Sequence, residues 1–111
     1  MTVFCLSEDR EIDEIGLRVA LCSLRRHCPE SPVCVFRARP SDDFRDWLRG
    51  FPRVELLPYS PPGASSWNCK PQALLHLMDR GRDEVVWIDA DLLLARDCRY
   101  LFRGLDPEVI A

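Results

Sequence analysis

With 111 residues, of which 47% are hydrophobic, the chain has enough apolar material for one domain with a buried core. The formal net charge of −3 gives no support for a surface that binds nucleic acid or an acidic membrane. No apolar run reaches the length of a membrane span, and no secretion signal is visible at the N-terminus, so we expect a cytoplasmic protein.

The pattern of apolar residues and chain breakers predicts four strands that alternate with three helices. We expect Glu14 and Arg18 to pair one turn apart on the solvent side of the first helix. Ser41 is expected to cap the second helix, and Pro71 suits the first turn of the third. In chain order we expect a strand over 2–7, a helix over 12–27, a strand over 32–38, a helix over 41–50, a strand over 54–59, a helix over 71–81 and a strand that starts at 85.

This βαβαβαβ order predicts an α/β fold: a Rossmann-like, mostly parallel sheet with flanking helices and right-handed crossovers. In such a fold each helix starts near the carboxyl end of the strand that it follows. Polar residues from distant parts of the chain should therefore meet at the edge of the sheet where open α/β proteins bind ligands. The residues expected there are Ser7, Glu8, Asp9, Arg37, Arg39, Lys70, Asp89 and Asp91.

The six cysteines are scattered through this pattern, and no two of them form a CxxC pair that would suggest zinc. We interpret most of them as buried small hydrophobes in a reducing compartment. They are Cys5, Cys22, Cys28, Cys34, Cys69 and Cys98.

Two aspartates, Asp89 and Asp91, directly follow the apolar run 85–88, which predicts a strand buried on both faces. Because side chains alternate along a strand, both carboxylates should project to the same side. Their mutual repulsion would be relieved by a divalent cation such as Mn²⁺ or Mg²⁺. The alternative is that they cap a loop or pair with Arg96 or Arg99.

Lys70 precedes Pro71, which should keep it in the loop before a helix, where an ammonium group and free amides favour phosphate. The alternative is a solvated lysine at a helix start. Asp9 either accepts a hydrogen bond from a ribose or base, or caps the first helix, and capping is the interpretation we favour. Trp67 and Asn68 either line the site or pack beneath the loop.

Three segments of the chain resemble one enzyme family. The sequence Asn68-Cys69-Lys70-Pro71, the segment VWIDADLLL over 86–94 and Leu101-Phe102 resemble the nucleotide-diphospho-sugar transferases of the GT-A fold. The segment CLSED over 5–9, with the helical residues 19–24, is similar to their glycogenin-like branch. The resemblance spans most of the chain.

The resemblance implies that Asp89 and Asp91 hold Mn²⁺ or Mg²⁺ against the diphosphate of a sugar donor, with Ala90 between them in the donor site. It also implies that the loop formed by Ser7, Glu8 and Asp9 approaches the nucleoside, and that Lys70 lies near the phosphates.

We therefore expect a metal-dependent glycosyltransferase, or its donor-binding half, that uses a nucleotide-sugar such as a UDP-sugar and an unknown acceptor. Members of the resembled family continue with further strands, an acceptor site and a later histidine. Residues 1–111 are accordingly expected to form an incomplete nucleotide-sugar-binding domain, truncated after the D-x-D strand and able to self-associate through the open sheet edge.

Two alternatives remain. One is a truncated, non-catalytic module of the same fold that binds a nucleotide or another chain. The other is a nucleotidyltransferase, which would use the same metal chemistry. P-loop and dinucleotide enzymes are not favoured, because the chain has neither a glycine-rich phosphate loop nor a GxGxxG segment.

Overall fold

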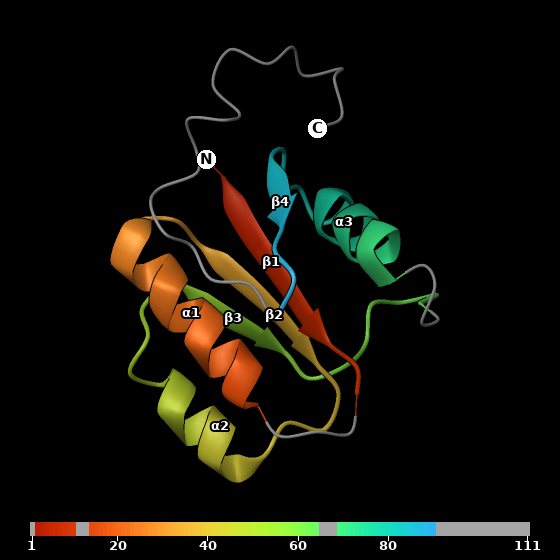
Figure 1. Ribbon diagram of the computed structural model, residues 1–111. Coiled ribbons are helices and arrows are strands. Elements are labelled where there is room, and N and C mark those ends of the chain that lie inside the picture. Colours follow the sequence, from red (N-terminus) through yellow and green to blue (C-terminus); the bar gives the residue numbers. More distant parts are fainter. Residues whose placement is uncertain (1, 11–13, 65–68, 91–111) are drawn as a thin grey trace.

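The computed structural model describes residues 2–10, 14–64 and 69–90, which form a four-stranded parallel sheet with flanking helices (Figure 1). This confirms the predicted Rossmann-like α/β arrangement. In chain order the elements are β1 (Val3–Glu8), α1 (Ile15–His27), β2 (Val33–Arg37), α2 (Asp42–Leu48), β3 (Val54–Leu57), α3 (Cys69–Asp79) and β4 (Val85–Trp87). Within the described ranges, no helix has the length and apolar character needed to cross a membrane.

The strand order is β3-β2-β1-β4, and every neighbouring pair runs parallel. The chain moves outward from β1 to β2 and β3, and then α3 carries it back to the other side of β1 (Figure 1). The order of strands therefore reverses at β1. In open α/β sheets, the crevice at the carboxyl ends of the strands flanking such a reversal is the usual ligand site.

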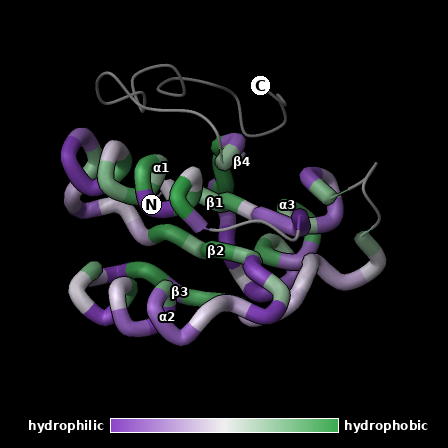
Figure 2. Tube along the Cα trace, turned by 60° about the horizontal axis from the view of Figure 1, so that its bottom comes forward, coloured by the Kyte–Doolittle hydropathy of each residue, from purple (hydrophilic) through white to green (hydrophobic). Residues whose placement is uncertain are grey.

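Alternation along the strands divides the apolar side chains between the two faces of the sheet. One face packs against α1 and α2, and its core includes Phe4, Leu6, Val33, Val35, Leu17, Leu21, Leu24 and Phe44. The other face packs against α3, and its core includes Val3, Cys5, Cys34, Phe36, Leu57, Ala73 and Leu77. Figure 2 shows that hydrophobic residues follow one another along β2 and β3, with hydrophilic segments in the connections around them.

The helix starts differ in part from those expected. Ser41 caps α2 as predicted, because its Oγ accepts a hydrogen bond from the amide of Phe44 at 3.1 Å. The prediction that Lys70 lies in a loop before the helix is wrong, since α3 already begins at Cys69. Pro71 then occupies the first turn, where its missing amide hydrogen breaks no helical hydrogen bond. The favoured capping role of Asp9 is also wrong: the N-cap position of α1 is Glu14, which makes no side-chain capping bond.

β4 is less buried than expected. Its three residues are all partly exposed, and among the described residues its only paired strand is β1. The prediction of a strand buried on both faces is therefore wrong for the part that the structure describes. An apolar run such as 85–88 looks the same in a strand at the edge of a sheet and in a strand at its centre. Hydrophobicity alone does not distinguish these two positions.

The described cysteines are all free thiols, and Cys98 lies outside the described residues. Cys5, Cys28 and Cys34 are buried, as interpreted from the sequence, whereas Cys22 is exposed. Burial raises the pKa of the Cys5 thiol well above its ordinary value, and burial also raises the pKa of Cys34. Cys5 and Cys34 therefore stay protonated and pack as small apolar groups.

Candidate functional site

The site begins where β1 and β4 end side by side. Cys5 and Trp87 are in register, and the amide of Ile88 donates to the carbonyl of Cys5 at 2.9 Å, which extends the pairing past β4. Ser7 and Asp89 each lie two residues further on. Because side chains alternate along the chain, both are placed on the face that α3 covers.

The first turn of α3 approaches the same point. The thiol of Cys69 donates a hydrogen bond to Ser7 Oγ at 3.3 Å, which ties the start of the helix to the end of β1. Lys70 is the next residue and is exposed. Free backbone amides at a helix N-terminus attract anions, so the lysine and the helix end favour the same kind of ligand.

Asp89 has a fixed carboxylate that is exposed to solvent. Its Oδ1 accepts a hydrogen bond from Trp87 Nε1 at 2.6 Å. Trp87 is itself half-buried against the α3-facing core. Within the described part of the chain, Asp89 makes no ion pair, so its charge is not already neutralised by a protein cation.

Sequence reasoning missed the contribution of Trp87. The signal was present, because a tryptophan two residues before an aspartate on the same strand face can donate its indole N–H to the carboxylate. Asp91, the predicted second ligand, lies outside the described residues, as do Trp67, Asn68, Arg96 and Arg99.

The donor set at this edge suits a hard cation only in part. Within the described ranges, no three His, Cys, Asp or Glu side chains are grouped so that they could hold a metal ion. Asp89 supplies an oriented carboxylate of the kind that Mn²⁺ and Mg²⁺ prefer. Mg²⁺ usually keeps several waters and binds through one or two carboxylates plus substrate phosphates, so one such residue fits a cation shared with a ligand.

Ala90 is held by backbone packing. It is buried, and its carbonyl oxygen would lie 3.1 Å from a Cβ placed on Gly16 in the first turn of α1. A side chain at Gly16 would therefore crowd this carbonyl. The close approach connects the segment after β4 to the start of α1.

Glu8 and Asp9 lie in different surroundings, although they are adjacent. Glu8 is buried on the opposite face from Ser7, and both of its carboxylate oxygens accept hydrogen bonds from the guanidinium of Arg10, at 2.8 Å each. These bonds lower the pKa of Glu8. Asp9 is exposed. It borders a shallow depression of about 200 Å³ between the ends of β1 and β2, which is also lined by Arg10, Arg37, Ala38 and Arg39.

A buried polar cluster adjoins this depression, because Arg37 belongs to the cluster and also lines the depression. Arg37 and Glu14 form an ion pair at 3.1 Å, in which each side chain is 8% exposed. The second carboxylate oxygen of Glu14 accepts a hydrogen bond from Ser41 Oγ. The predicted pairing of Glu14 with Arg18 is therefore wrong, because tertiary structure turns Glu14 inward. Arg18 instead lies over the ring of Trp47, 5.5 Å from its centroid.

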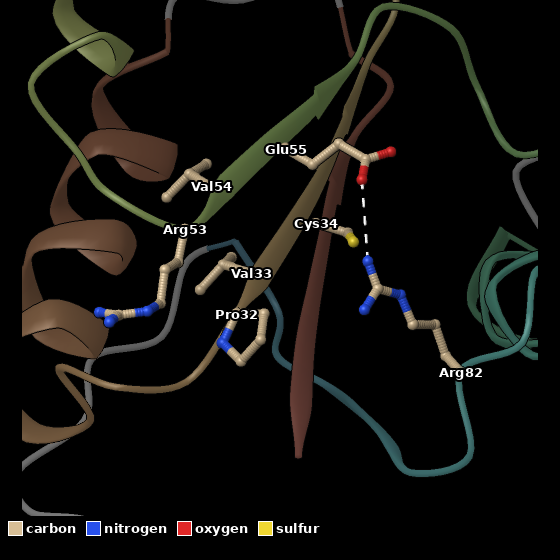
Figure 3. A pocket seen from close by; sticks show the side chains of 7 residues that line it. All are labelled: Pro32, Val33, Cys34, Arg53, Val54, Glu55 and Arg82. Atoms are coloured by element: carbon tan, nitrogen blue, oxygen red, sulfur yellow. Dashed lines mark ion pairs between the residues drawn. The ribbon is translucent and has the colours of Figure 1, made fainter. Parts of the chain in front are cut away.

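A second depression lies at the other edge of the sheet, among the starts of β2 and β3 and the segment before β4 (Figure 3). Its volume is about 340 Å³. Glu55 lies within it and pairs with Arg80 at 3.0 Å and with Arg82 at 3.9 Å. Arg80 and Arg82 are already paired with the carboxylate of Glu55. The depression also lies at the amino ends of the strands, whereas the usual ligand site lies at their carboxyl ends. Those of the expected polar groups that the structure describes lie at the carboxyl ends of the strands instead.

The chain matches no protein-family model and no curated protein sequence.

Proposed function

We propose that the carboxyl edge of β1 and β4 binds the diphosphate of a nucleotide-sugar through Mn²⁺ or Mg²⁺, with a UDP-sugar as the first candidate. The chain would then be the donor-binding part of a metal-dependent glycosyltransferase of the GT-A type. Two observations carry this proposal, both at the carboxyl ends of the neighbouring strands β1 and β4, where the strand order reverses. Cys69 at the start of α3 contacts Ser7 on β1, and Trp87 on β4 orients the carboxylate of Asp89.

The charges at this edge favour a diphosphate that is bound together with a divalent cation. Lys70 and the first turn of α3 attract a diphosphate. Asp89 alone would repel it, and no described cation neutralises this carboxylate. A divalent ion shared between Asp89 and the diphosphate satisfies both groups.

Each group has a definite role in this proposal. Asp89 holds the cation, Trp87 orients Asp89, Lys70 contacts the phosphates, and Ser7 joins the start of α3 to β1. The resemblance adds Asp91 as a second metal ligand, and places the loop around Asp9 near the nucleoside. A bound cation would supply electrostatic stabilisation of the departing nucleoside diphosphate.

Calorimetric titration of UDP, with Mn²⁺ or with EDTA, tests this proposal. We expect UDP to bind at least about tenfold more tightly with Mn²⁺, because the cation removes the repulsion between the carboxylate and the phosphates. Asp89→Asn should abolish most of this difference. Asp83→Asn is the matched control, because Asp83 is also exposed but lies just before β4, at the other edge. Equal affinity in Mn²⁺ and EDTA would contradict the proposal, as would an unchanged Asp89→Asn variant.

Turnover tests whether these residues are catalytic by themselves. Release of UDP from a UDP-sugar in the presence of Mn²⁺, with transfer of the sugar to water or to an acceptor, would show that they are. Metal-dependent UDP binding without any release of UDP from a panel of UDP-sugars is the result expected of a donor-binding part alone, and equally of a non-catalytic module with the same site.

A further inference from the structure

The structure assigns to Arg37 the role of a positioning residue. Arg37 holds the loop that carries Asp9 in the conformation that binds the nucleotide. This inference rests on the proposed function and extends it to a residue on β2. Arg37 is the last residue of that strand and pairs in register with Glu8 on β1. It is only 6% exposed.

The guanidinium of Arg37 holds the loop on both sides of Asp9. Its Nη1 donates to the carbonyl oxygen of Glu8 at 3.3 Å and to that of Arg10 at 2.6 Å. Asp9 lies between these two carbonyls. Two hydrogen bonds from one rigid group therefore restrict the backbone that presents the exposed Asp9 side chain.

The other side of the same guanidinium is anchored to the helices. Nη2 donates to Glu14 Oε2 at 3.1 Å, and Glu14 in turn accepts from Ser41, the N-cap of α2. Arg37 thus connects the loop after β1 to the starts of α1 and α2. A lysine could keep the positive charge, but its single ammonium nitrogen cannot reproduce the planar fork that reaches these three acceptors among the described residues.

A loop that is already fixed binds more tightly, because a flexible loop loses conformational entropy when the ligand orders it. Asp9 and Arg37 line the same shallow depression at the ends of β1 and β2. The groups proposed to contact the diphosphate lie on the other side of β1, on the face covered by α3. Loss of the Arg37 contacts should therefore weaken binding of the nucleoside part and spare binding of the diphosphate part.

Two variants separate positioning of the loop from general support of the fold. Arg37→Lys weakens the ion pair and removes the fork that holds the two carbonyls. Glu14→Gln removes the negative charge of the pair but keeps an oxygen that can accept from Arg37, and it leaves Arg37 and its carbonyl contacts in place. The probes are UDP and inorganic pyrophosphate, each titrated in the presence of Mn²⁺.

We expect Arg37→Lys to raise the Kd for UDP about five- to tenfold, while the Kd for pyrophosphate changes less than about twofold. Glu14→Gln should leave both values within about twofold. If Arg37→Lys does not fold, the double variant Arg37→Gln with Glu14→Gln removes both buried charges and should show the same selective loss.

Amide hydrogen exchange of the ligand-free protein tests the loop without any nucleotide. The amides of Asp9 and Arg10 should exchange at least about fivefold faster in Arg37→Lys than in Glu14→Gln, with β1 amides as the internal reference. Equal exchange in the two variants would overturn the inference. Equal loss of UDP and pyrophosphate binding, or an unchanged Kd for UDP, would also overturn it. Failure of the unaltered chain to bind UDP with Mn²⁺ would instead contradict the proposed function, while the exchange comparison would still decide whether Arg37 holds the loop.

Discussion

Replacement of Glu14 by alanine should destabilise the fold far more than the loss of an ordinary surface charge. Glu14 and Arg37 are each 8% exposed at the side chain, so the variant removes the carboxylate that pairs with a buried guanidinium. Breaking a buried pair in this way typically costs about 3–5 kcal/mol. The hydroxyl of Ser41 also loses its acceptor. Because small domains are stable by only about 5–15 kcal/mol, this loss is a large part of the total.

Urea unfolding followed by circular dichroism measures this effect. At a slope of about 2 kcal/mol per molar urea, a loss of about 4 kcal/mol moves the midpoint down by about 2 M. Asp46→Ala is the matched control, because it breaks an exposed pair with Arg49 and should cost at most about 1 kcal/mol. The double variant Glu14→Leu with Arg37→Met should recover part of the loss, since neither charge remains buried. A cost for Glu14→Ala as small as that of the control would refute this reasoning.

Three further results are expected. Trp87→Phe keeps an aromatic ring but removes the indole N–H that orients Asp89, so calorimetry should show Mn²⁺ affinity lower by about 10- to 100-fold, and unchanged affinity would exclude an orienting role. Lys70→Ala should weaken UDP binding by about 1–3 kcal/mol and leave uridine binding unchanged, whereas equal losses would indicate damage to the fold. The pKa of Glu8 is lowered mainly by hydrogen bonds from Arg10, so its contribution is complete above the unfolded pKa of about 4.3 and is lost as the pH falls through the lower folded value. Urea midpoints measured from pH 6 to pH 3 should therefore fall less steeply in Arg10→Ala, and identical slopes would show that this pair is not responsible.

The order and type of the helices and strands follow from local patterns in the sequence. Alternating apolar residues in β1 and β2 and the helical spacing of Leu17, Leu21 and Leu24 are local patterns, and each must be buried by a neighbouring layer. The cap formed by Ser41 is also local, because donor and acceptor are three residues apart. A strand–helix alternation of this length leaves few arrangements other than a parallel sheet, so the meeting of polar groups at its carboxyl edge could be expected from sequence.

The interaction partners of the polar groups at this edge depend on how the strands and helices are arranged in space. The sequence pattern places Glu14 on the solvent side of α1, but the end of β2 brings Arg37 to it from 23 residues away. Ser7 likewise meets Cys69 across 62 residues of chain. Periodicity records which positions are apolar, whereas a buried ion pair depends on which strand ends lie side by side. That neighbourhood is fixed by the strand order, which local sequence does not encode.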